Sequence, residues 1–186
     1  MTSTIAELYY GATRIRLQQG RVLDNLSAGL YTDANSRGVM GAGLAADLRR
    51  AAGAEVEREL RACAPLLVGE AHLTSGGALS PLGVTAIAHG VVVSEKGVTS
   101  SLDLASRALL TGLRLLEEAG CRSISVPQIA WRVANLDHQI AALELARVIL
   151  THLRRQTRLN EITIVSLHRE YLQVVADTLR KQTHES

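Results

Sequence analysis

Phenylalanine is absent from this chain of 186 residues, and all aromatic residues together make up only 3% of it. The core must therefore be built from Leu, Ile, Val and Ala, and few rings are present that could stack on nucleobases. Cysteine is also scarce, because Cys63 and Cys121 are the only two and they lack CxxC spacing. This excludes a zinc finger and argues against a disulfide framework. The six histidines show no metal-ligand spacing, so we expect no metal and no cofactor.

Long apolar runs are missing as well. No segment approaches the roughly 20 apolar residues that a membrane span requires, and the opening MTSTIAELYYGATRIR does not have the pattern of a signal peptide. The net charge of +2 is too small to indicate nucleic-acid binding from composition alone. With two cysteines that we take to be reduced, these features predict a cytoplasmic protein that makes no contact with a membrane.

The hydrophobic periodicity predicts strands that alternate with helices along one domain, residues 1–186. We expect a short leading helix over 1–12 and helices over 44–61, from 102 to a cap at Gly120, around 140–153 and over 169–182; Gly53 breaks the first of these long helices. Ile140 and Leu143 are expected on the buried face of the helix around 140–153. We expect strands over 14–17, 28–32, 71–74, 84–93, 123–126 and 161–166, with 84–93 either continuous or bulged at Gly90. Such alternation predicts a largely parallel sheet covered on both faces.

The stretch TDANSRGVMGAGLA, residues 32–45, joins a predicted strand to a predicted helix. The N–H groups at the start of a helix attract anions, and glycines there let a phosphate approach the main chain. Asn35 can donate to and accept from sugar hydroxyls. These residues favour a phosphorylated sugar as ligand, although the glycines at 38, 41 and 43 fit a tight strand-to-helix turn equally well. The stretch matches neither the dinucleotide fingerprint G-x-G-x-x-G nor a P-loop.

Several segments, in this order, resemble the macro domain family. They are DANS at 33–36 with its glycine turn, RAAG at 50–53, VGEA at 68–71, TSGG at 74–77, AH at 88–89, SL at 101–102 and SISVPQI at 123–129. The resemblance covers about 14–180 and implies a three-layer α/β/α sandwich with a mixed, largely parallel central sheet. It also implies binding of ADP-ribose, with Asn35 at the distal ribose and Gly41, Ala42 and Gly43 along the ribose and diphosphate.

The sequence departs from the family pattern at four places. Arg21 stands where the family has an adenine-binding Asp, and a guanidinium has no acceptor for the adenine amino group. Ala45 stands at the position of the catalytic Asp, and we expect Asp47 to face away on the helix. The second phosphate loop lacks its glycines over 130–137, where Trp131 could stack on a base and Arg132 could bind the diphosphate. Leu167-His168 replaces an aromatic ring.

Two functions follow from the resemblance and these departures. The first is a divergent macro domain that binds ADP-ribose, a related nucleotide diphosphate sugar or an ADP-ribosylated macromolecule. Whether it is an enzyme stays open: the reaction would be ADP-ribosyl hydrolysis, with Asn35 as the best candidate residue. The second is a macro fold that has lost this ligand and binds RNA or protein, with Arg21, Arg37 and Arg132 forming a basic mouth.

Overall fold

The computed structural model describes residues 2–94, 101–129 and 137–183. Its strands are β1 Ser3–Tyr10, β2 Thr13–Gln19, β3 Gly29–Asn35, β4 Ala71–Ser75, β5 Ala86–Val93, β6 Ser123–Pro127 and β7 Glu161–Ser166. Its α-helices are α1 Gly43–Ala52, α2 Ala54–Ala62, α3 Leu102–Glu118, α4 His138–Leu153 and α5 Arg169–Thr183, and its short 3-10 helices are η1 Val22–Asp24 and η2 Gly77–Leu82.

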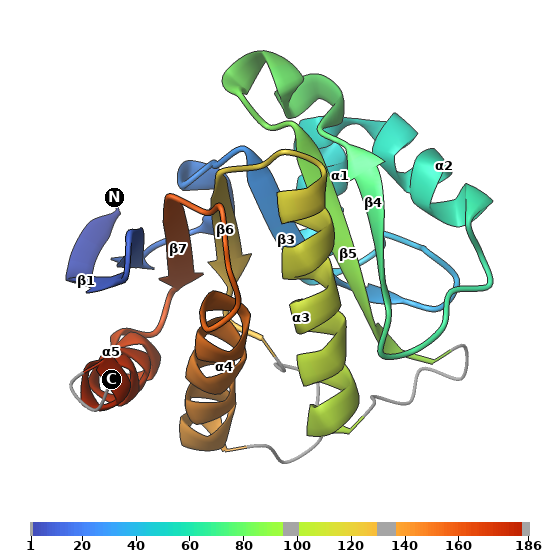
Figure 1. Ribbon diagram of the computed structural model, residues 1–186. Coiled ribbons are helices and arrows are strands. Elements are labelled where there is room, and N and C mark those ends of the chain that lie inside the picture. Colours follow the sequence, from blue (N-terminus) through green and yellow to red (C-terminus); the bar gives the residue numbers. More distant parts are fainter. Residues whose placement is uncertain (1, 95–100, 130–136, 184–186) are drawn as a thin grey trace.

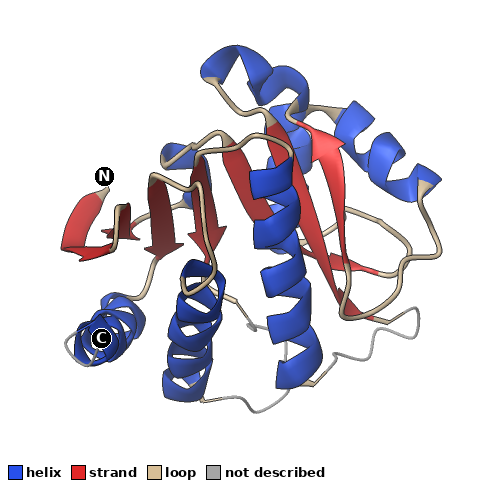
Figure 2. Cartoon of the chain, in the orientation of Figure 1, coloured by secondary structure: helices blue, strands red, loops and turns tan. Residues whose placement is uncertain are grey.

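The strands form one mixed sheet in the order β1-β2-β7-β6-β3-β5-β4 (Figure 1). The five inner strands run parallel, and the edge strands β1 and β4 pair antiparallel with their neighbours. One core lies between the sheet and α3, α4 and α5, and a second lies between the sheet and α1 and α2. Figure 2 shows the resulting helix, sheet and helix layers. The three-layer α/β/α sandwich with a largely parallel sheet is therefore confirmed.

On the face of β3 that α3, α4 and α5 cover, the core is filled by a tyrosine rather than by an aliphatic residue. Tyr31 is 1% exposed and is one of the largest fully buried side chains. Its ring lies against the two glycines of its neighbours: a Cβ built on Gly90 of β5 would be 1.8 Å from Tyr31 Oη, and one on Gly112 of α3 would be 2.8 Å from the ring. Gly90 therefore makes room for this ring. The register shift between β3 and β5 lies beyond it, where Ala34 pairs with Val91 and Asn35 with Val93.

Two expectations about helices are wrong. The first residues form strand β1 instead of a helix over 1–12, because β2 offers them an antiparallel partner that their own sequence does not reveal. In α4, Ile140 and Leu143 are 47% and 48% exposed. The buried face of this helix combines alanines with long aliphatic side chains: Ala142 and Ala146 are buried together with Leu145, Ile149, Leu150 and Leu153. Of the expected face, Ile140 and Leu143 in the first half of the helix are exposed, whereas Leu150 and Leu153 further along it are buried.

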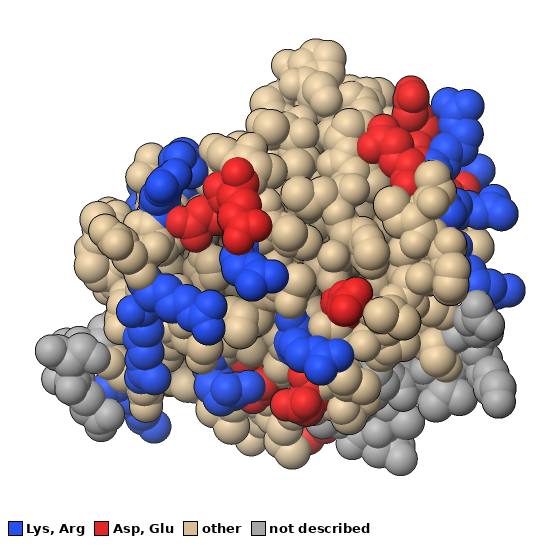
Figure 3. All heavy atoms as spheres, turned by 45° about the vertical axis from the view of Figure 1, so that its right-hand side comes forward, with Lys and Arg blue, Asp and Glu red and all other residues tan. Residues whose placement is uncertain are grey.

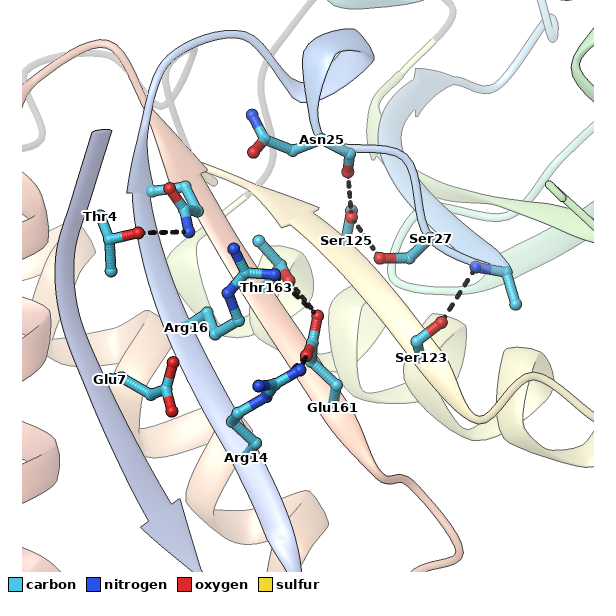
Figure 4. A network of polar contacts seen from close by, with 12 residues as sticks. Thr4, Glu7, Arg14, Arg16, Asn25, Ser27, Ser123, Ser125, Glu161 and Thr163 are labelled. Carbon is cyan, nitrogen blue, oxygen red and sulfur yellow. Dashed lines mark hydrogen bonds and ion pairs between the residues drawn. The ribbon is translucent and has the colours of Figure 1, made fainter. Parts of the chain in front are cut away.

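On the face that α1 and α2 partly cover, strands β2, β7 and β6 carry a polar network (Figure 4). The guanidinium of Arg14 donates from Nε to Glu161 Oε2 at 2.8 Å, and Arg16 reaches Glu161 Oε1 at 3.4 Å. On β6, the hydroxyl of Ser125 contacts Ser27 Oγ at 2.7 Å. These contacts join strands that are far apart in sequence, so this part of the sheet is held by ion pairs and hydroxyl groups instead of an apolar helix face.

A buried histidine lies in β5. His89 is 0% exposed, and its Nε2 lies 2.9 Å from Thr74 Oγ1. Its Nδ1 has no hydrogen-bond partner among the described residues. Burial, and then the nearby His72, lowers the pKa of His89 from 6.5 to about 3. The neutral imidazole is therefore a structural element of the sheet.

We predict that His89 makes the fold sensitive to acid. Its folded-state pKa lies below the unfolded one, so the unfolded chain binds the extra proton between pH 6.5 and about 3. Stability is full above that window and falls as pH is lowered through it, by about 1.4 kcal/mol per pH unit. Urea unfolding between pH 7 and 4.5 should show this slope in the wild-type chain and a flatter one in His89→Gln.

The matched control is Ile87→Val, a neighbouring core variant without a titratable group. It should lower stability by about 1 kcal/mol at every pH and leave the slope unchanged. A His89→Gln variant with the wild-type slope would show that another group causes the acid sensitivity.

Candidate functional site: a cleft over the glycine loop

A cleft of about 630 Å³ lies at the carboxyl ends of the parallel strands. Its walls come from residues 20–23 after β2, 32–35 at the end of β3, 92–93 of β5, 127–128 of β6 and 165–167 of β7. Residues 37, 39, 41–45 and 47 of the glycine loop and α1 form the remaining wall. Ligands of open α/β sheets bind at such strand ends. The cleft thus brings together segments that are spread over almost the whole chain.

The three glycines of the loop serve different purposes. Gly38 has a φ of +66°, and a Cβ there would lie 3.2 Å from the backbone nitrogen of Arg61, so this glycine is needed for the turn and for packing on α2. Gly43 begins α1 with a φ of +57°. Gly41 lines the cleft, and the nearest atom to an added Cβ is Val39 Cγ1 at 3.6 Å. The turn explains two of the glycines, and Gly41 leaves bare main chain at the cleft.

The start of α1 opens into this cleft without a side-chain cap. Its N-cap residue is Ala42, which makes no side-chain hydrogen bond, and the first turn carries no acidic residue. Gly43, Leu44 and Ala45 all line the cleft. A helix start with uncapped N–H groups carries a partial positive charge and offers donors to an anion. This wall is therefore suited to a negatively charged group.

Asn35 organises the loop with its side chain. Its Nδ2 donates to the carbonyl of Val39 at 2.7 Å, and its Oδ1 accepts from the backbone N–H groups of Arg37 at 3.1 Å and Val39 at 3.2 Å. Asn35 also lines the cleft. The carboxamide is therefore largely committed to holding residues 35–39 in place, which leaves one N–H of Nδ2 for a ligand. A ligand contact by Asn35 stays a prediction.

Helix α2 supports the same loop from behind. Glu57 accepts from the backbone N–H of Met40 through Oε1 at 2.8 Å and pairs with Arg49 Nε through Oε2 at 2.6 Å. The carbonyl of Ser36 accepts from the N–H of Leu66 at 2.8 Å. The loop is thus fixed at several points before any ligand binds, which lowers the entropy cost of binding.

Arg21 and Asp47 meet across one end of the cleft. Arg21 Nη2 donates to Asp47 Oδ2 at 3.3 Å, and Arg50 pairs with Asp47 Oδ1. Both Arg21 and Asp47 line the cleft, so the expectation that Asp47 faces away is wrong. The reason is that Asp47 lies three residues after Leu44, one turn along the same helix face. The contact joins residues 26 positions apart in the sequence.

Asp33 is a cleft residue that the sequence reasoning did not single out. It stands near the end of β3 and lines the cleft. Burial first, and then the charge of Asp33, raises the pKa of Tyr31 well above its ordinary value. Burial raises the pKa of Tyr171, and Asp33 adds to this effect. The carboxylate therefore lies close to two phenols that are buried in the core.

A second polar group lies at the ends of β6 and β7. Ser166 Oγ donates to Gln128 Oε1 at 2.7 Å and accepts from the backbone N–H of His168 at 3.0 Å, and Gln128 Nε2 lies 3.3 Å from His138 Nδ1. Gln128 and Ser166 both line the cleft. Nothing in their local sequence signals this, because the contact depends on the parallel pairing of β6 with β7.

Most of the remaining predicted site residues line the cleft. Gly41, Ala42 and Gly43 form one wall, Arg21 and Ala45 line the cleft, and Leu167 lies at its edge. Trp131 and Arg132 lie outside the described residues. Within the described part of the chain, no cluster of three His, Cys, Asp or Glu side chains could hold a metal ion.

A profile of the macro domain family matches residues 33–144, which include the glycine loop, α1 and the cleft-lining ends of β3 and β5. The chain belongs to the macro domain family. An uncharacterized protein of Aquifex aeolicus is 30% identical over 135 residues, which cover 73% of this chain and 80% of that protein. One from Aeropyrum pernix is 38% identical over 113 residues, 61% of this chain, and the match spans 58% of the length of that protein.

Solved macrodomains share the fold. The Oceanobacillus iheyensis macrodomain with ADP has a TM-score of 0.83 to this macro domain at 17% identity, with 100% of both chains covered. The Trypanosoma brucei macrodomain in complex with ADP-ribose has a TM-score of 0.70 at 22% identity and covers 88% of this chain and 68% of its own. At these identities the likeness establishes the architecture, and the site must be argued from this chain's own residues.

We predict that the amide oxygen and the amide nitrogen of Asn35 hold the loop through separate hydrogen bonds. Asn35→Ala should speed amide hydrogen exchange at Arg37 and Val39, because both N–H groups lose their acceptor. Asn35→Asp keeps an acceptor oxygen and loses only the donor to the Val39 carbonyl, so it should preserve most of this protection. Unchanged exchange in Asn35→Ala would refute the positioning role.

Proposed function

We propose that the cleft binds ADP-ribose or a related nucleoside diphosphate sugar. The observation that carries this proposal is the uncapped start of α1, which faces the cleft next to the bare main chain of Gly41. A diphosphate supplies the negative charge and the acceptor oxygens that such a wall attracts. Because the loop is already held by Asn35 and Glu57, its donors are in place before the ligand arrives.

The length of the cleft suits such a ligand. Three inter-strand steps separate the ends of β2 and β3, a distance of about 14 Å at roughly 4.8 Å per step. Leu23 and Leu167 line the β2 and β7 end, and Asn35 lines the β3 end. Leucines at one end, the start of α1 as an anion site, and the polar groups of Asn35 and Arg37 at the other end match a base, a diphosphate and a sugar in that order.

The neighbouring folds support the same proposal. The Oceanobacillus iheyensis macrodomain was solved with ADP and the Trypanosoma brucei macrodomain with ADP-ribose. For this chain we extend the ligand to an ADP-ribosylated macromolecule, whose modified group would enter the open cleft.

We also propose that the protein is located in the cytoplasm. None of its described helices is long and apolar enough to cross a bilayer.

We predict that Gly41→Glu abolishes binding of ADP-ribose in calorimetry, while the wild-type chain gives saturable heat. The space around Gly41 admits a side chain, so the fold should survive, and the new carboxylate would repel the diphosphate. The matched control is Gly41→Gln, which has the same size without charge. It should weaken binding less than Glu does, because the charge repulsion is absent.

An equal loss of affinity for ADP-ribose in Gly41→Glu and Gly41→Gln would show that the ligand group next to Gly41 is not an anion. Absence of saturable heat from the wild-type chain at millimolar concentrations of both ADP-ribose and its guanine counterpart would refute the proposed function.

Hydrolysis at the distal sugar is a second candidate function, and Asp33 is the observation in its favour. Hydrolysis needs a base that can activate water. Asp33 and Asp47 are the carboxylates among the described residues that line the cleft. Asp47 is engaged by Arg21 and Arg50 at the opposite end from Asn35. Asp33, two residues before Asn35 on β3, is therefore the carboxylate nearest the predicted sugar.

If the chain hydrolyses ADP-ribosyl esters, Asp33→Asn should lower the rate by about 100-fold or more, since a positioned general base contributes about 10²- to 10⁴-fold. Affinity for ADP-ribose should change little. A turnover assay on an ADP-ribosylated peptide, paired with calorimetry, measures both. An Asp33→Asn variant with the wild-type rate would exclude this residue as the base.

The alternative of an RNA- or protein-binding module receives less support from the site. Of the three arginines expected to form a basic mouth, Arg21 and Arg37 line the cleft together with two carboxylates, Asp33 and Asp47, and Arg132 lies outside the described residues. On the face shown in Figure 3, basic and acidic side chains are interspersed. A polyanion would be favoured by a patch of one sign, so the nucleotide proposal accounts for more of the described residues.

A further inference from the structure

We propose that the cleft prefers a nucleotide with a 6-oxopurine base, guanine or hypoxanthine, over one with adenine, and that Arg21 sets this preference. The inference rests on the proposed function, since it names the base of the ligand at that same site. It follows from the place of Arg21, from the contacts of Asp47 and from the hydrogen-bonding pattern of purines.

The base belongs at the end of the cleft where β2 and β7 stop. Leu167 is 64% exposed although it is apolar, and it lines the cleft together with Leu23 and Val22. Gln19 Nε2 donates to the carbonyl of Leu167 at 3.2 Å, which ties the strand ends together. Apolar walls of this kind cover the faces of a planar ring. At the other end, Asn35 and Arg37 supply polar groups beside Val39, Val92 and Val93.

Arg21 offers only donors to a base at this end. A guanidinium has five N–H groups and no acceptor, and among the described residues its side chain makes one hydrogen bond, to Asp47. Arg21 is 60% exposed at its side chain, so this surface ion pair is weak and the guanidinium can turn to a ligand at little cost.

Both carboxylate oxygens of Asp47, which lies at the same end, already have guanidinium partners. Its Oδ2 accepts from Arg21 and its Oδ1 pairs with Arg50. A donor on the ligand, such as the amino group of adenine, would have to compete with two guanidinium groups for these oxygens. This end of the cleft is therefore rich in donors and poor in accessible acceptors.

The two purine types respond differently to such an end. Guanine and hypoxanthine present O6 and N7 as adjacent acceptors, which the planar fork of an arginine binds with two hydrogen bonds. Adenine presents N7 beside an amino donor, so one N–H of the fork would face another N–H. Arg21 therefore gains two bonds with a 6-oxopurine and at most one with adenine.

The test is calorimetry of the full chain with GDP, IDP and ADP. GDP and IDP should bind with similar affinity, and both about fivefold to hundredfold tighter than ADP, because a bidentate arginine contact discriminates by this amount. IDP has the O6 and N7 of GDP without its 2-amino group. GDP that binds tighter than both IDP and ADP would assign recognition to the 2-amino group and overturn the role of Arg21.

Two variants address the residue itself. Arg21→Met keeps an exposed side chain of similar length without donors and should reduce the GDP-to-ADP ratio to below about twofold, and Arg21→Asp should abolish the preference for IDP over ADP because a carboxylate has no donor for O6 and N7. The control Arg37→Met removes an arginine from the other end of the cleft and should leave the ratio unchanged. Circular dichroism checks that each variant is folded.

Different experimental results would overturn the base preference and the proposed nucleotide binding. Wild-type protein that binds ADP as tightly as GDP, or Arg21→Met protein with the wild-type ratio, overturns the base preference and leaves nucleotide binding intact. Protein that gives no saturable heat with GDP, IDP, ADP or the corresponding diphosphate sugars overturns both.

Discussion

The unpaired N–H groups at the start of α1 are the constraint on which the rest of the site depends. No side chain caps them, so their hydrogen bonds must be completed by solvent or by a ligand in the cleft. The protein keeps this end open by fixing the residues before it: Asn35 holds the turn from the strand side, and Glu57 holds Met40 from the side of α2. An anion that enters the cleft then meets donors that need no rearrangement.

Gly53 makes this support possible. It lies between α1 and α2 with a φ of +94°, where an L side chain would be strained. The break lets α2 turn back, and the carboxylate of Glu57 then reaches both the glycine loop and Arg49 of α1. Strand β3, whose end lines the cleft, is fixed in a different way, by the ring of Tyr31 between Gly90 and Gly112. In a chain without phenylalanine, this single ring ties β3 to β5 and α3.

Much of the architecture could be predicted from the sequence, because strands and helices are specified by local periodicity. The strand at 161–166 and the break at Gly53 are found as predicted, and the order of short motifs indicates the macro fold that the family match and the solved structures confirm. The first strand was missed because its stability comes from pairing with β2. In α4, Ile140 and Leu143 were wrongly placed on the buried face, which Leu145, Ile149 and Leu153 occupy together with alanines.

The sequence by itself determined which residues carry donors and acceptors: a glycine loop before a helix, a lone carboxamide at Asn35, and an arginine at 21. Only the tertiary structure decided what those groups do. It turned the Asn35 amide back onto its own loop, brought Asp47 across to Arg21, and placed Asp33 beside two buried phenols. The reason is physical: hydrogen-bonding capacity belongs to each residue, whereas its partner is set by strand order and helix packing, which bring distant segments within 3 to 4 Å of each other.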